Sequence, residues 1–302
     1  MMHLLFFFAV LFAVCASNSA HAQTSYEIAP PSINMPLSNP FQGGETETPN
    51  AIDLGTSVKL AALLSETTPI LTRDVIWRIY SERADEQQGL SLVTETNDAQ
   101  PQLRLPPGNY VINAAFGRAT VTRRLQIGNV PINDRFILNA GGLVLGGAVD
   151  KQAIANAKLT ATVFTGPGPG GMLVLESAHA GQIIRLPEGD YYVISRYGDA
   201  NAMLAADISI QSGMVTEATM NHRAAQVVLK LANESGGEAI ANTTWSVLTP
   251  GGDTVKEMIG AFPSVILQQG EYTAIARNEG RTFNANFTVE PGKDLEIEVL
   301  TQ

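Results

Sequence analysis

Short stretches of alternating apolar and polar residues, separated by Gly, Pro, Asn and Asp, fill the chain from about residue 53 onward. Alternation with a period of two puts successive side chains on opposite faces of a strand, so this pattern predicts half-buried β-strands. No segment shows the sustained, capped 3.6-residue period of a helix. The C-terminal part of the chain gives the clearest prediction, with strands at 227–231, 245–248, 255–259, 265–267, 272–276, 283–289 and 295–300. The sequence therefore predicts an all-β chain.

The same pattern occurs three times. A Gly-x-Tyr tripeptide, preceded by an apolar stretch and followed by an alternating strand, recurs at two equal intervals of 81 residues. Its members are Gly108 and Tyr110, Gly189 and Tyr191, and Gly270 and Tyr272. Each copy then turns at a further glycine, which is Gly117, Gly198 or Gly280. Equal spacing of this kind indicates an internal repeat.

Each repeat has the size of a small sandwich domain, because seven short strands in about 80 residues are typical of a β-sandwich. We therefore predict three tandem β-sandwich domains at 53–140, 141–222 and 223–302, the first with a longer insert over 81–100. Residues 23–52 are punctuated by Pro and Asn and lack an apolar period, which predicts a flexible linker.

Residues 1–22 have the features of a signal peptide. An apolar run over 4–14 precedes the small-residue motif Ala20-His21-Ala22, and the run is shorter than the roughly 20 residues that a membrane span needs. The segment before the run carries no Lys or Arg, and two alternatives stay open: a buried N-terminal element, and a lipoprotein anchored at Cys15. Cleavage after Ala22 predicts a periplasmic or secreted protein with no later membrane span.

Composition narrows the function classes. Among 302 residues, 29 acidic and 19 basic side chains give a net charge of −10, which repels nucleic acid. Cys15 is the only cysteine, so the exported chain would have no disulfide. Two histidines, His179 and His222, follow the leader; we interpret them as solvated turn residues and expect no metal or other cofactor, because a metal site needs three or four ligands.

A family resemblance is carried by Leu105–Tyr110, Leu186–Tyr191 and Leu267–Tyr272. Their Leu-x-x-Gly-x-Tyr pattern resembles the tyrosine corner of Ig-like sandwiches, which implies that each tyrosine hydroxyl bonds a backbone carbonyl a few residues upstream. The third copy continues this pattern with further residues, namely Val227–Leu229, Gly236, Gly237, Trp245–Val247, Gly292 and Leu295–Leu300. With these it resembles the carboxypeptidase-regulatory-like, or prealbumin-like, repeat of bacterial exported proteins still more closely. That resemblance implies a sandwich module and no particular ligand. The positions of the six glycines and tyrosines are expected to be structural.

Other candidate residues allow two readings. Trp77 and Trp245 occupy equivalent repeat positions and could stack on a sugar, although core packing is the favoured interpretation. Arg118, Arg123, Arg124 and Arg135 could form a basic strip facing an anionic polymer, or a solvated strand face. Acidic residues at turns, such as Glu188 and Asp190, could belong to a glycosidase-like pair, but their neighbours predict exposed turns.

Repetition without a catalytic motif predicts a non-catalytic binding or structural module of the bacterial cell envelope. It would present sandwich loops or edges to an envelope protein or polysaccharide. A carbohydrate-binding protein with exposed aromatics is the alternative, and an enzyme with an undetected carboxylate site is a further one. We expect no catalytic residue.

Overall fold

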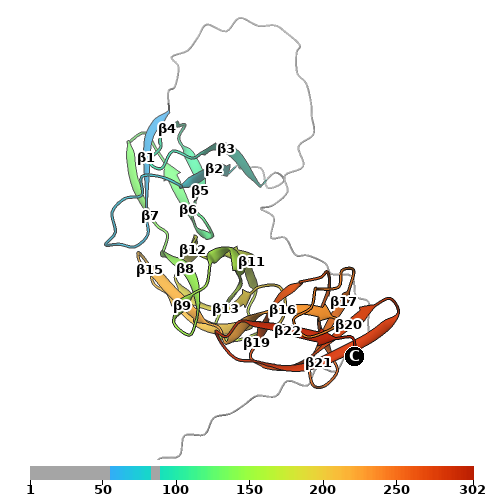
Figure 1. The fold of residues 1–302 in the computed structure, drawn as a ribbon. Helices are drawn as coiled ribbons and strands as arrows, with labels where there is room; N and C mark the ends of the chain where they lie inside the picture. The colour runs from blue at the N-terminus through green and yellow to red at the C-terminus, as the bar shows by residue number, and fades with distance from the viewer. Residues whose placement is uncertain (1–54, 83–88) are drawn as a thin grey trace, which may run out of the picture. The chain divides into compact units, whose positions relative to one another are not determined.

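The computed structural model describes residues 55–82 and 89–302, and in these ranges the protein is all-β. The single helical turn of the described residues is η1 (Asn156–Lys158). The strands form six sheets, which follow the chain as three successive strand sets of two sheets each (Figure 1). The predicted signal peptide at 1–22 and linker at 23–52 lie outside the described residues.

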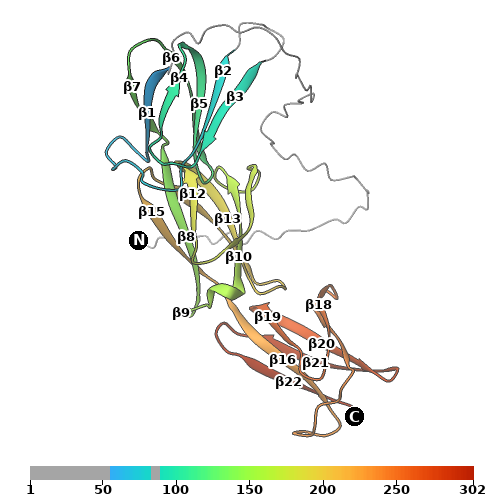
Figure 2. The same ribbon diagram turned by 90° about the horizontal axis from the view of Figure 1, so that it is seen from above.

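The first strand set pairs strands far apart in sequence. Its strands are β1 (Thr56–Leu63), β2 (Ile76–Glu82), β3 (Leu90–Thr96), β4 (Gln102–Leu105), β5 (Gly108–Phe116), β6 (Ala119–Ile127) and β7 (Ile132–Ile137). One sheet has the order β4-β1-β7 and the other β3-β2-β5-β6. β1 runs parallel to β7 and antiparallel to β4. Figure 2 displays both sheets of this set in blue and green.

The second strand set repeats this topology. Its strands are β8 (Ala140–Val149), β9 (Gln152–Ala153), β10 (Leu159–Thr165), β11 (Leu173–His179), β12 (Ile183–Pro187), β13 (Gly189–Tyr197), β14 (Met203–Ile210) and β15 (Val215–Asn221). The sheets have the orders β12-β8-β15 and β11-β10-β13-β14, and the short β9 pairs with β8. The parallel pair is now β8 with β15.

The third strand set repeats the topology again, with two sheets of its own in the orders β19-β16-β22 and β18-β17-β20-β21. Its strands are β16 (Ala224–Ala232), β17 (Thr244–Leu248), β18 (Thr254–Ile259), β19 (Ser264–Gln268), β20 (Gly270–Asn278), β21 (Arg281–Val289) and β22 (Leu295–Leu300). All seven strands predicted from the sequence lie within these bounds, so the strand prediction is confirmed.

Each strand set has a hydrophobic cluster of its own. Alternate residues of the strands face inward: β17, for example, buries Trp245 and Val247 and leaves the residues between and beside them partly or fully exposed. The three clusters include Trp77 and Phe136 in the first set, Val163 and Leu186 in the second, and Trp245 in the third. The described residues from Gly55 onward nevertheless belong to one compact unit. The domain boundaries at 140/141 and 222/223 therefore stay a prediction.

Candidate functional site at the junction of the first two strand sets

The three repeat tyrosines have the same hydrogen bond. Tyr110 Oη donates to the carbonyl of Pro106 at 2.9 Å, Tyr191 to Pro187 at 2.8 Å and Tyr272 to Gln268 at 2.8 Å. Each acceptor lies four residues before its tyrosine, at or just after the end of one strand, and the next strand begins at the repeat glycine. This is the geometry of a tyrosine corner. All three rings are buried, and burial raises the pKa of each hydroxyl above its ordinary value.

Neither repeat tryptophan is available to a ligand. Trp77 and Trp245 are both 0 % exposed. Trp77 packs edge-on against Phe136, with ring centroids 5.2 Å apart, and Trp245 Nε1 donates to the carbonyl of Gly260 at 3.0 Å. The reading of these side chains as sugar-stacking residues is therefore wrong, because alternate inward positions of β2 and β17 bury both rings in the sandwich cores.

The two histidines differ from each other. His179 at the end of β11 is exposed, as expected. His222 is 4 % exposed, and its Nε2 lies 2.9 Å from the hydroxyl of Ser195. The expectation of a solvated turn is wrong for His222, because its ring packs against that of Tyr197, with centroids 5.9 Å apart. Burial lowers the pKa of the His222 imidazole.

The predicted basic strip is neutralised over part of its length. Arg123 pairs with Asp134 at 3.2 Å, and Arg124 pairs with Glu82 at 2.7 Å. These are exposed strand faces with acidic partners, which favours the solvated-face reading for them. Arg118 lies elsewhere, in the turn between β5 and β6, next to the second strand set.

Arg185 of β12 joins the first two strand sets. Its guanidinium donates to Asp74 at 2.7 Å and lies over the ring of Phe116, 4.5 Å from the centroid. Its carbonyl accepts a 3.0 Å bond from the backbone amide of Arg118. Gly117 makes this approach possible: it has φ +64°, and a Cβ on it would lie 2.6 Å from the Cβ of Arg185.

The junction of the second and third sets uses the corresponding positions. Gly198, with φ +74°, lies 81 residues after Gly117, and a Cβ on it would meet the Cβ of Ile266 at 3.0 Å. Ile266 in turn lies 81 residues after Arg185. Lys256 of the third set pairs with Asp199 of the second at 2.7 Å. Both junctions thus have the same contact, between a glycine turn of one strand set and a strand of the next, although the strand residue is Arg185 at the first junction and Ile266 at the second.

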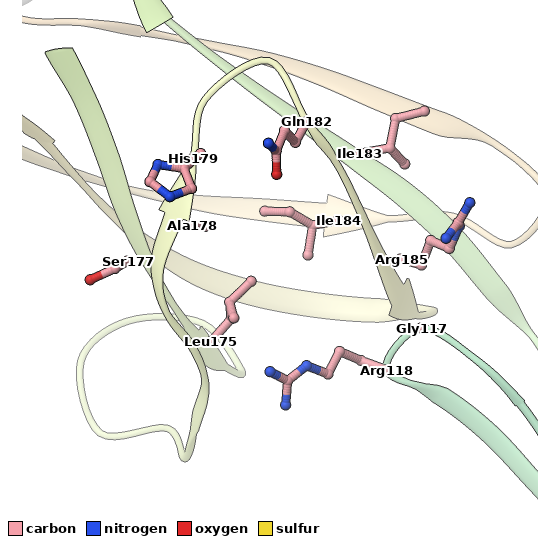
Figure 3. A pocket seen from close by; sticks show the side chains of 10 residues that line it. All are labelled: Gly117, Arg118, Leu175, Ser177, Ala178, His179, Gln182, Ile183, Ile184 and Arg185. Atoms are coloured by element: carbon pink, nitrogen blue, oxygen red, sulfur yellow. The ribbon is translucent and has the colours of Figure 1, made fainter. Parts of the chain in front are cut away.

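Between the β5–β6 turn and strands β11 and β12 lies an open pocket of ≈ 420 Å³. Leu175 and Ile184 are apolar members of its lining, and the polar members are Arg118, Ser177, His179, Gln182 and Arg185. Figure 3 shows the side chain of Arg118 extending toward Leu175, while that of Arg185 extends away from it. This pocket is the candidate site.

Sequence reasoning missed the roles of Arg185, Asp74 and Arg118 at this junction. The 81-residue spacing did mark Gly117 and Gly198 as equivalent turns, and the same spacing aligns Arg185 with Ile266. What the sequence lacked was the information that these turns contact the next repeat. The one signal in the sequence was the equal spacing that aligns Gly117 with Gly198 and Arg185 with Ile266.

Acidic residues provide no comparable cluster. Glu188, Asp190, Glu271, Asp294 and Glu296 are all exposed at turns and strand ends, as expected. In the described ranges, no group of three or more His, Cys, Asp or Glu is positioned to hold a metal ion. No helix of the described part of the chain has the length and apolar character to cross a membrane.

Comparison with protein families gives one match. The model of the Rhizobiales growth-associated tandem repeat domain matches residues 226–301, which is close to the third strand set and well under half of the chain. A tandem repeat family agrees with the predicted repetition. The resemblance to the carboxypeptidase-regulatory-like repeat is not what this match names, and it stays a prediction. No curated protein matches the chain.

Among solved structures, the chain is similar to the TIE protein of Bacillus anthracis, at 14% identity over 82% of this chain and 50% of that one, with a TM-score of 0.24. It thus spans half the length of that protein. It is also similar to GBS52, the minor pilin of Streptococcus agalactiae, at 11% identity over 56% and 95% of the two chains, with a TM-score of 0.29. A streptococcal ancillary pilin is similar at 10% identity over 82% and 99%, with a TM-score of 0.28. Similarities at this level carry no conclusion about function.

Proposed function

We propose that this protein is an exported, non-catalytic module of the bacterial cell envelope, in which joined β-sandwich repeats present their surfaces to a protein or polysaccharide partner. The observation that carries the proposal is the repeated junction. Gly117 against Arg185 and Gly198 against Ile266 are equivalent contacts between successive strand sets. A chain that reuses one contact to join copies of one fold is organised to hold repeats together.

The links between the strand sets support this reading. Only Leu138 and Asn139 separate β7 from β8, and only His222 and Arg223 separate β15 from β16. Links this short differ from the long, flexible, Gly- or Ser-rich linkers that let domains move freely. Each junction also has a cross-set ion pair, Arg185 with Asp74 and Lys256 with Asp199. The division into domains at 53–140, 141–222 and 223–302 is part of this proposal.

Export is the first point to test. Envelope and cytosolic fractions of cells that make the protein are separated, and the N-terminus of the chain is sequenced in each. The proposal expects envelope or secreted protein that begins at Gln23. A chain that retains Met1 and stays in the cytosol, or one lipidated at Cys15, contradicts the predicted address.

Partner binding is tested in cells with a photo-crosslinking residue at an exposed position. Val130 of the first strand set is 74 % exposed, Met172 of the second is 70 % exposed and Ile259 of the third is 76 % exposed, so these positions tolerate the probe. The chain without the probe serves as control. The expected result is one envelope component captured from an exposed position and not from the control chain. Failure to capture any envelope component from surface positions of all three strand sets contradicts the proposal.

A further inference from the structure

We propose that the pocket between the β5–β6 turn and strands β11 and β12 binds a carboxylate-bearing saccharide, such as a uronate unit of an acidic polysaccharide. The inference rests on the proposed function and names the chemistry of its partner. The pocket volume, ≈ 420 Å³, falls in the range of small-molecule sites, about 300–1,000 Å³.

Arg118 is the group that would recognise the carboxylate. The other arginine of the lining, Arg185, is already neutralised by Asp74. The guanidinium of Arg118, by contrast, has no ion pair or hydrogen bond to any described residue, and only its backbone amide is engaged. The described residues that line the pocket include no Asp or Glu. A planar guanidinium with free donors matches the two oxygens of a carboxylate.

The remaining lining suits a sugar ring. Figure 3 shows Arg118 on one side of Leu175 and Ile184, with His179 and Gln182 on the other. The half-buried side chain of Leu175 offers a surface for the C–H face of a pyranose, whereas Ile184 is 8 % exposed and belongs to the hydrophobic core against which Leu175 packs. The amide of Gln182 and the imidazole of His179 can donate to and accept from ring hydroxyls. A few polar groups around apolar surface are typical of sites that orient a small ligand.

The corresponding pocket at the next junction, of ≈ 390 Å³, lacks these features. Its lysine, Lys158, is bonded through Nζ to the side-chain oxygen of Gln226 at 3.2 Å. Its turn residue Asp199 is acidic and pairs with Lys256, and Ile266 stands in place of Arg185. With respect to the described residues, a cation without a partner is therefore found in the first of these two pockets, and Lys158 provides a control at the second.

The test measures binding of the full-length chain to three polymers by titration calorimetry at near-physiological salt. Polygalacturonate carries a carboxylate on each sugar, dextran is neutral, and dextran sulfate carries sulfates. We expect polygalacturonate to bind, and Arg118→Gln to weaken its binding roughly ten-fold or more. Arg118→Lys should weaken binding less, because an ammonium keeps the positive charge but cannot donate two parallel hydrogen bonds to a carboxylate. Gln182→Ala should also weaken binding. Lys158→Gln should leave it unchanged.

Thermal unfolding of each variant shows whether its fold is intact. We expect an intact fold in the Arg118 variants, because the hydrogen bond from the backbone amide of residue 118 to the carbonyl of Arg185 is retained. The proposal is overturned if polygalacturonate does not bind, or if Arg118→Gln and Lys158→Gln have equal effects. The assignment to a uronate is overturned if dextran binds as tightly as polygalacturonate. It is also overturned if Arg118→Gln weakens the binding of dextran sulfate as much as it weakens the binding of polygalacturonate. If these binding tests fail while the crosslinking experiment captures an envelope partner, the proposed function stands and the saccharide assignment is rejected.

Discussion

Asn201 Nδ2 donates a 2.9 Å hydrogen bond to the hydroxyl oxygen of Tyr272, across the junction between the second and third strand sets. The other end of the same amide, Oδ1, accepts from the backbone N–H of Gln268 at 3.1 Å. Since Tyr272 itself donates to the Gln268 carbonyl, one asparagine of the second set is bonded to both partners of the third tyrosine corner. The corner therefore contributes to the junction as well as to its own sandwich.

This arrangement predicts energetic coupling between Asn201 and Tyr272. Asn201→Ala and Tyr272→Phe should each lower the free energy of unfolding, and the double variant should lose less than their sum by about 0.5–1.5 kcal/mol, since both remove one shared hydrogen bond. Urea unfolding of the four proteins measures the coupling. As control, Asn201→Ala combined with Tyr110→Phe should be additive, and additivity in both pairs would contradict the shared bond.

Tyr110 and Tyr191 make the corner bond to the backbone without a comparable asparagine bond in the described residues. Tyr110→Phe and Tyr191→Phe keep the buried ring and remove only the hydroxyl, so each should cost about 1 kcal/mol of unfolding free energy. Chemical denaturation measures both values. Unchanged stability in both variants would mean that the corner bond has no stabilising role.

Gly117 and Gly280 form a matched pair for the junction contact. Both have left-handed backbone, φ +64° and +78°, but a Cβ on Gly117 would strike Arg185, whereas one on Gly280 meets nothing within 4 Å. Gly280→Ala should therefore cost only the backbone strain, about 1–2 kcal/mol. Gly117→Ala should cost roughly 1–3 kcal/mol more, because β12 must shift. Equal losses in urea unfolding would contradict the close approach.

His222 predicts a pH-dependent stability. Its pKa in the folded chain lies below the ordinary value of 6.5, so below that pH the unfolded chain binds a proton that the folded chain resists. The stability that the neutral His222 gives the folded chain is thus fully present above pH 6.5, and it is lost as the pH falls below that value through the pKa of the folded chain. Comparing unfolding free energies at about pH 7.5 and about pH 5.5 should reveal a loss that His222→Asn reduces. The exposed His179 is the control: His179→Asn should retain the full loss.

The third strand set should fold alone. Residues 223–302 contain both of its sheets and the buried cluster around Trp245. We expect the isolated segment to unfold cooperatively, although with lower stability than in the full chain, because the bonds from Asn201 are absent. Circular dichroism with thermal and urea unfolding tests this. A segment without a cooperative transition would show that the domain boundary at 222/223 is wrong.

The strand positions followed from local patterning, since an alternating segment has only one way to bury its apolar face. Trp245 and Val247 illustrate this: spacing by two assigned them to the same face, and both are buried. His222 illustrates the limit, because its burial comes from Ser195 and Tyr197, which are distant in sequence. No local pattern carries that information.

The sequence by itself determined that this protein is an all-β repeat, because period-two alternation, turn residues and an 81-residue spacing are all properties of the chain taken locally. The tertiary structure alone decided which turns contact the next strand set and that Arg185 is neutralised by Asp74. It also decided that the Arg118 side chain lines a pocket without a partner among the described residues. The physical reason is that charge compensation and close approach depend on three-dimensional distance. Residues as far apart in the chain as Asp74 and Arg185 meet only after the sheets have formed.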